Sequence, residues 1–262
     1  MGNFFHVTFF EPIFNGLFWF VRIIPGHDLG LAIIAITLLI RVILIWPSIL
    51  QIRSSKSMQE LGPKLKALQK EFGNDRQELA KRTMALYREH KVNPVTGCLP
   101  LLIQLPFLFA MYQVFIGGLQ VDATTHILSA AKQADLYGPL RAVADSTPIG
   151  TTFLGFLDIT AAKNIFLAVL VGATQYVQAK MLTPTTAKTP KTEGAKDEQM
   201  ATAVSRQMTI IMPVFIAYIS YVVPAGLGLY FLTSNIFSIV QQWLLLRKSQ
   251  PPTETPSLPA AT

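Results

Sequence analysis

Five long apolar runs, separated by polar segments, dominate the hydrophobic pattern of the chain. They cover residues 28–50, 98–118, 161–181, 208–223 and 225–246. A helix needs about 20 apolar residues to cross a bilayer core of about 30 Å, and most of the runs have this length. The fourth is shorter and ends at Pro224, where the turn "PAGL" leads into the fifth. The pattern predicts an all-α, polytopic membrane protein with five transmembrane helices.

An apolar, aromatic stretch precedes these runs within an N-terminal segment at residues 1–27. Glu11-Pro12 and Asn15-Gly16 interrupt it. Its second half has an amphipathic pattern, which predicts a short external helix lying in the membrane interface. A sixth span is the alternative. The first Lys or Arg is Arg22, so the basic n-region of a cleavable signal peptide is missing.

Basic residues alternate between the loops. The 51–97 loop carries ten Lys and Arg residues, whereas the 119–160 loop carries two, together with four aspartates. The 182–207 loop is again basic, and Arg247-Lys248 follows the last run. Because Lys and Arg favour the cytoplasmic side, the N-terminus is expected outside and the C-terminus in the cytoplasm.

The 51–97 loop has a helical pattern of its own. An apolar seam with spacings of 3, 4, 3 and 4 is typical of helices that pack together; it consists of Met58, Leu61, Leu65, Leu68 and Phe72. Gly73-Asn74-Asp75 ends this helix and a second follows over 76–90. We therefore predict a cytoplasmic helical hairpin, with a merely solvated helical pair as the alternative. The 182–207 loop and the 247–262 tail have the composition of flexible segments.

The composition agrees with a membrane protein. Only 14% of the residues are charged and 51% are hydrophobic, whereas about 25% are charged in a soluble domain. The net charge of +7 follows from the basic loops, so no nucleic acid binding is expected. Cys98 is the single cysteine and the four histidines are scattered, so we expect no disulfide, metal or cofactor.

Polar residues inside the spans are the strongest functional signal. Arg41 lies near the middle of the first span, where an arginine raises the cost of insertion by about 2.5–3.5 kcal/mol. Three other spans carry polar residues at a similar depth, in the predicted cytoplasmic half: Gln104, Gln175, Gln178, Ser234, Asn235, Ser238 and Gln241. Gln242 widens the polar stripe of the last span. Since polar groups avoid lipid, we predict a polar groove open to the cytoplasm.

Each polar residue also has a simpler interpretation. Arg41 could extend its long side chain to the cytoplasmic headgroups. Gln104 could be an interhelical hydrogen-bonding residue, and Ser234 and Ser238 could allow close helix packing. The shared depth of these residues favours the groove.

Three segments resemble the YidC/Oxa1/Alb3 family of membrane protein insertases. They read "GHDLGLAIIAITLLIRVILIWPSILQIRSSKSMQEL", "ALYREHKVNPVTGCLPLLIQLPFLFAMYQVF" and "PAGLGLYFLTSNIFSIVQQWLL". The resemblance covers nearly all of 28–118 and 205–246, and the lack of a large external domain is similar to the short bacterial form.

The resemblance implies a five-span core with a groove open to the cytoplasm and to lipid. Arg41 matches the positive groove residue, Gln104 and Gln175 match groove-lining positions, and Trp243 is expected at the inner mouth. Ser234 and Asn235 fall in the motif of the last span. The hairpin matches one that receives clients and contacts the targeting or translocation machinery. The tail beyond Lys248 contains no base, so strong anchoring of a ribosome by the tail is not expected.

The sequence thus predicts an insertase of the bacterial plasma membrane and not an enzyme. It would move short polar tails of client proteins across the inner half of the bilayer and release client helices into lipid. The expected partners are nascent membrane proteins with one or two spans, the bilayer and, on the family resemblance, the ribosome, the targeting machinery and the Sec translocon. A small channel or transporter is the alternative. An intramembrane protease is disfavoured because all four histidines lie outside the spans.

Overall fold

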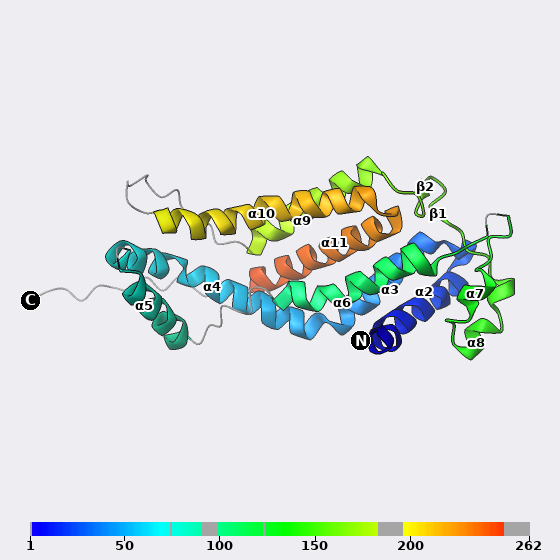
Figure 1. Ribbon diagram of the computed structural model, residues 1–262, viewed down its shortest axis with the longest axis horizontal. Helices are drawn as coiled ribbons and strands as arrows, with labels where there is room; N and C mark the ends of the chain where they lie inside the picture. The colour runs from blue at the N-terminus through cyan, green and yellow to red at the C-terminus, as the bar shows by residue number, and fades with distance from the viewer. Residues whose placement is uncertain (1, 74, 91–98, 123, 183–195, 249–262) are drawn as a thin grey trace, which may run out of the picture.

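The computed structural model describes residues 2–73, 75–90, 99–122, 124–182 and 196–248. Cys98 and most of the two segments predicted to be flexible lie outside the described residues. The described chain forms an elongated, mostly helical bundle (Figure 1). Its longer elements are α2 (Glu11–Ile23), α3 (Leu29–Ile43), α4 (Ile45–Phe72), α5 (Arg76–Glu89), α6 (Leu99–Gln113), α9 (Ile165–Leu182), α10 (Lys196–Val222) and α11 (Ala225–Lys248).

The N-terminal segment is helical over almost its whole length, and α2 is the helix expected in its second half. α1 (Gly2–Phe5) and a π-helical turn (His6–Phe10) lead directly into α2. Pro12 lacks the N–H that would continue an α-helix, and the wider turn before it fits this loss. Gly16 allows α2 to lie close to α3, because a Cβ at this position would come within 2.9 Å of the Ile36 side chain.

The first predicted span is not straight. α3 ends at Ile43, α4 starts at Ile45, and the two axes meet at 66°. Pro47 explains the break, because it cannot donate a hydrogen bond to the carbonyl of Ile43 and its ring crowds that carbonyl. The bend redirects α4 out of the bundle.

The hairpin projects from one end of the bundle, where α5 packs back on α4 (Figure 1). Of the predicted seam, Leu61 is buried, and Met58, Leu65, Leu68 and Phe72 are half-buried. The guanidinium of Arg82 on α5 lies 5.4 Å from the centre of the Phe72 ring. Gln59 donates a hydrogen bond of 3.3 Å to the carbonyl of Met181 at the end of α9. The base of the hairpin is therefore attached to the bundle.

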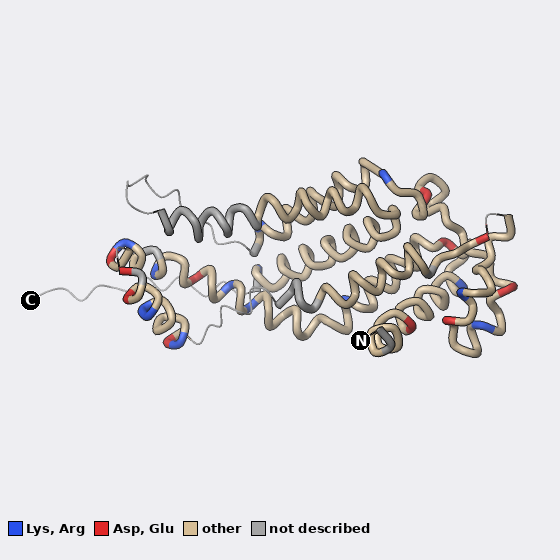
Figure 2. Tube along the Cα trace, viewed as in Figure 1, with Lys and Arg blue, Asp and Glu red and all other residues tan. Residues whose placement is uncertain are grey.

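Five apolar helical stretches overlap the five predicted spans. Among the described residues, Ala225–Arg247 is the one straight helix long and apolar enough to cross a bilayer, and Leu29–Ile43 with Ile45–Leu65 would qualify as one bent span. Gln104–Gly117, Ile165–Met181 and Thr209–Val222 are apolar but shorter. The apolar stretch Thr209–Val222 lies within the predicted fourth span, but α10 already begins at Lys196, so part of the loop expected to be flexible is helical. Figure 2 shows charged residues gathered toward the two ends of the bundle.

The end opposite the hairpin carries a folded cap, residues 119–164. It contains α7 (Ala130–Gln133), α8 (Gly138–Arg141) and an antiparallel pair of two-residue strands, β1 (Thr152–Phe153) and β2 (Leu157–Asp158). This strand pair is a small departure from the predicted all-α fold. Asp28 joins the cap to α3, because one carboxylate oxygen accepts from the N–H groups of Gly30 and Leu31 and the other accepts from Leu154.

The hydrophobic core occupies the half of the bundle next to the cap, where α2, α3, α6 and α11 meet. Gly226 on α11 faces the ring of Phe115, which a Cβ would approach to within 2.2 Å. We expect Gly226→Ala to lower the free energy of unfolding by about 1–3 kcal/mol, the usual cost of overpacking. Chemical denaturation in detergent measures this effect. Gly117→Ala is the control, because a Cβ there meets nothing within 4 Å; equal stability of the two variants would contradict the prediction.

Candidate functional site

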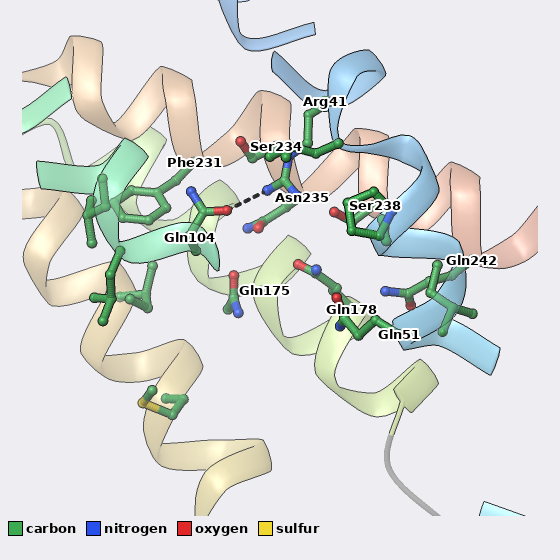
Figure 3. Close-up of a pocket in the computed structure, with 18 residues that line it drawn as sticks. Arg41, Gln51, Gln104, Gln175, Gln178, Phe231, Ser234, Asn235, Ser238 and Gln242 are labelled. Atoms are coloured by element: carbon green, nitrogen blue, oxygen red, sulfur yellow. Dashed lines mark hydrogen bonds between the residues drawn. The ribbon is translucent and has the colours of Figure 1, made fainter. Parts of the chain in front are cut away.

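A cavity of about 280 Å³ lies between the helices, on the hairpin side of the core (Figure 3). α3, α4, α6, α9, α10 and α11 all contribute side chains to its wall. The polar lining residues are Arg41, Ser48, Gln51, Gln104, Gln175, Gln178, Ser234, Asn235, Ser238 and Gln242. The apolar ones are Leu44, Pro47, Ile52, Leu105, Leu108, Met212, Ile216 and Phe231. Seven of the nine predicted groove residues therefore lie around one cavity.

Among the described residues that line the cavity, Arg41 is the only charged one. Its Nη2 donates a hydrogen bond of 2.9 Å to Oε1 of Gln104, whose side-chain amide in turn donates to the hydroxyl of Tyr230. Among the described residues, no carboxylate forms an ion pair with Arg41. The guanidinium points into the cavity, toward Gln104 (Figure 3). Its charge is thus held by neutral partners only.

Polar residues of α11 connect this helix to its neighbours. Asn235 is buried, and its Nδ2 donates to Oγ1 of Thr174 at 3.2 Å and to the carbonyl of Val171 at 3.4 Å. Asn235 therefore lines the cavity and also joins α11 to α9. Ser234 and Ser238 are buried on the same face. Close helix packing, the simpler interpretation of this serine pair, is compatible with their place in the wall.

Two predicted groove residues do not line the cavity. Gln241 turns toward α4, where its Oε1 accepts a hydrogen bond of 2.8 Å from Ser48 and its Nε2 donates to the carbonyl of Ile45. Trp243 is 52% exposed and lies 5.2 Å from the guanidinium of Arg247. Gln241 thus joins α11 to α4 and Trp243 is exposed on α11, so contact of these two residues with a client stays a prediction.

Three lining residues were missed or undervalued from sequence. Ser48 and Gln51 lie beyond the bend at Leu44, which turns the first part of α4 across the cavity. Pro47 is the signal that could have revealed this, since a proline in a helical run marks a kink. Gln242 was expected only to widen the polar stripe of α11, yet it is the buried glutamine of this helix that faces the cavity.

Toward the cap, apolar side chains fill the bundle. Four of them are at most 1% exposed: Ile33, Met111, Val114 and Leu227. The bundle is therefore closely packed on the cap side of the cavity. Within the part of the chain that the structure describes, no group of His, Cys, Asp and Glu could hold a metal ion. The chemistry available at this site is hydrogen bonding and the attraction of one buried cation for anionic groups.

Comparison with known proteins assigns the chain to a family. The sequence signature of the 60Kd inner membrane protein family matches residues 12–252. The chain belongs to this family. The membrane protein insertase YidC of Fusobacterium nucleatum is 34% identical over 221 residues, covering 84% of this chain and 87% of that protein. The YidC of Streptomyces avermitilis is 30% identical over 235 residues, covering 87% of this chain and 53% of that protein. The resemblance to YidC seen in the sequence motifs is confirmed.

A solved structure supports the fold of this family member. The crystal structure of an active YidC insertase, with its first transmembrane domain resolved, superposes with a TM-score of 0.54 at 24% identity. The match covers 88% of this chain and 45% of the other. At this identity the likeness supports the helical fold alone, so the role of the cavity is inferred from its own chemistry.

Proposed function

We propose that this family member is a membrane protein insertase of the bacterial plasma membrane. One observation carries the proposal: Arg41 points into a polar cavity between six helices and has no carboxylate partner among the described residues. A buried cation without a counter-ion costs free energy, and such residues inside membranes generally serve a function. An acidic group on a passing polypeptide would supply the missing anion.

In this proposal the five apolar stretches cross the membrane, with the cap outside and the hairpin in the cytoplasm. The α9 and α10 surfaces support an orientation toward lipid, because they expose large apolar side chains, among them Phe166, Val169, Val214 and Tyr218. The N-terminal helix exposes Trp19 and Ile23, which suits the outer membrane interface. The basic loops favour a cytoplasmic C-terminus.

The cavity would lower the barrier that a polar tail meets in the bilayer. Water and polar side chains in the inner half leave only the outer half as an apolar barrier, and Arg41 attracts an acidic tail most strongly where water is scarce. The client's apolar helix then leaves sideways into lipid, where its burial provides the driving force. No bond is made or broken in this process.

The proposed partners are nascent membrane proteins with one or two spans and short polar external segments. The hairpin is the proposed contact for clients and for the ribosome, the targeting machinery or the Sec translocon. Its attachment to α9 through Gln59, and its continuity with the α4 turns that carry Ser48 and Gln51, would connect such a contact to the cavity wall.

A channel or transporter would need a polar path through the whole membrane. The filled core between the cavity and the cap argues against this alternative, since Ile33, Met111 and Leu227 are nearly inaccessible. Solute flux across the membrane of proteoliposomes that contain the protein would support the channel or transporter instead.

Site-specific crosslinking tests the proposal directly. A photoreactive amino acid at Arg41 or Gln104 is expected to crosslink a ribosome-stalled, single-span client, whereas one at Phe166 on the outer surface of α9 should crosslink mainly lipid. Crosslinks of equal yield from all three positions, or none from the cavity, would contradict an insertase that receives its client there.

A further inference from the structure

The small strand pair of the cap ends in an apolar turn next to the cap ends of α9 and α10 (Figure 1). Residues 154–156 form this turn between β1 and β2, and we call them the hairpin tip. Leu154 is 59% exposed and Phe156 is 73% exposed. The paired side chains just before and after the tip, Phe153 and Leu157, pack against the hydrophobic core instead. The strand pair therefore buries one set of apolar side chains and presents another outward.

Hydrogen bonds hold the hairpin tip in place. The N–H of Leu154 donates to the carboxylate of Asp28 at 2.9 Å, and the other oxygen of this carboxylate caps the start of α3. Beyond β2, the N–H of Lys163 donates to the carbonyl of Tyr221 near the end of α10, at 2.7 Å. The tip is thus fixed to the bundle on both sides, so a contact with a partner costs little further conformational entropy.

Leu154 is an unusual residue for a turn that faces only water. Its φ of 50° lies in the left-handed region, where the Cβ of an L-residue crowds the following carbonyl. Gly, Asn and Asp are preferred in such turns, and Gly155, with φ 79°, follows this preference. A large, exposed apolar side chain at position 154 has a conformational cost that no packing within the protein offsets. This indicates a contact outside the protein.

The helices next to the hairpin tip indicate that the contact is lipid. At about 1.5 Å per residue, the apolar stretches Ile165–Met181 and Thr209–Val222 are about 26 and about 21 Å long, shorter than a bilayer core of about 30 Å. Ile165 and Phe166 begin the exposed apolar face of α9, and the tip continues this apolar surface past the end of the helix. Lys163, between the tip and α9, is exposed and forms no ion pair within the described chain, so its ammonium is available to a lipid phosphate.

We propose that the hairpin tip is a lipid anchor of the cap. Leu154 and Phe156 enter the headgroup region of the outer leaflet, and Lys163 binds phosphate groups beside them. Burial of the two apolar side chains provides the driving force. Through Asp28 the anchor also holds the start of α3, the helix that carries Arg41. The inference rests on the proposed orientation of the protein, with the cap outside.

The size of the hairpin tip favours lipid over a protein partner. A stable protein–protein interface buries roughly 800 Å² on each partner, and two side chains supply only a fraction of this area. Apolar side chains at a membrane surface need no such area, because each one adds binding energy by entering the headgroup boundary. A second copy of the chain is the occupant against which lipid is tested.

Lipid photocrosslinking tests the anchor in the full-length protein, reconstituted in vesicles of phosphatidylethanolamine and phosphatidylglycerol. A photoreactive phenylalanine analogue at Phe156 should crosslink lipid within about twofold of the yield from Phe166, and at least about fivefold above the yield from Thr125. Thr125 is the control because it is exposed in a polar turn of the same cap. Equal yields from Phe156 and Thr125 overturn the inference, as do crosslinks between two copies of the chain in place of lipid.

A polar hairpin tip provides the second arm. Leu154→Asn combined with Phe156→Ser removes both apolar side chains, and asparagine tolerates the left-handed backbone at position 154. With the photoreactive residue at Thr152, which is exposed on β1, this double variant should crosslink lipid at least about fivefold less. Lys163→Gln alone should lower the yield about twofold, since a single exposed ion pair is weak. Tyr137→Ser, which removes another exposed aromatic side chain of the cap, should leave it unchanged.

Crosslinking from Phe166 separates the anchor from the rest of the proposal. In the polar-tip variant this yield should stay at the wild-type level, because the bundle remains folded and embedded. Unchanged crosslinking from Thr152 overturns the inference, and so does a loss at both Thr152 and Phe166, since the tip would then stabilise the bundle instead of contacting lipid. Client crosslinks from Arg41 and Gln104 report on the insertase function independently, so the anchor can fail while that function stands.

Discussion

Replacing Arg41 by alanine is expected to lower the insertion of clients with acidic tails by at least about tenfold, while clients with neutral tails lose less than about threefold. The difference arises because a carboxylate near the guanidinium gains Coulomb energy that a neutral tail does not. Two charges 4 Å apart interact by about 4 kcal/mol at an effective dielectric constant of 20. If the transition state of insertion retains even a third of this energy, insertion is about tenfold faster than without it. Insertion of matched clients that differ only in Asp or Asn at one tail position measures the effect.

Arg41→Lys should retain much of the activity toward acidic tails, because the positive charge remains in the cavity. The hydrogen bond to Gln104 requires a long side chain with a donor at its end, which lysine also provides. Arg53→Ala is the control, since Arg53 is exposed on α4 and does not line the cavity. Equal activity of the alanine, lysine and wild-type proteins toward every client would remove Arg41 from the mechanism.

The sequence predicts well which polar residues of the long apolar runs come together around the cavity. Arg41, Gln104 and Gln175 could be assigned to one depth because the rise of an α-helix is constant and the topology followed from the loop charges. Two adjacent residues of α11 could not be assigned equally well. Gln241 and Gln242 both lie near the polar face of α11, and the choice between them depends on the position of α4. The bend at Leu44 sets that position: it places Ser48 against Gln241 and leaves Gln242 facing the cavity.

The ends of the molecule were harder to predict, for a different reason. Glu11-Pro12 and Asn15-Gly16 read as local breaks, yet tertiary contacts hold residues 2–23 in helical structure. Local propensity cannot reveal that Gly16 permits contact with Ile36, or that Asn15 finds its partners about 120 residues later in the cap. Contacts of this kind are not encoded in a hydrophobic period, and they decide whether the 119–160 loop is a flexible connection or a folded cap.

Asn15→Ala is expected to lower the free energy of unfolding by about 2–4 kcal/mol and to loosen the cap. Asn15 is 3% exposed. Its Nδ2 donates to the carbonyls of Glu11 and Asp135, at 2.8 and 3.0 Å, and its Oδ1 accepts from the N–H of Tyr137 at 2.6 Å. Alanine removes the side-chain partner of both cap groups, and each unsatisfied buried group costs about 1–3 kcal/mol. Thermal unfolding in detergent should show a midpoint lower by about 5–10 °C.

Limited proteolysis shows whether this loss is local. If Asn15 holds the cap on α2, the variant should be cleaved faster within residues 124–146 while the hairpin keeps its wild-type cleavage rate, because the two lie at opposite ends of the bundle (Figure 1). Asn15→Asp should fall between alanine and the wild type, since its carboxylate still accepts from Tyr137 but cannot donate to Asp135. Thr8→Ala, at an exposed position of the preceding helical turn, should leave both rates unchanged. Faster cleavage at both ends of the Asn15→Ala variant would mean that Asn15 stabilises the whole bundle, and the cap would then not be a separate unit held by this residue.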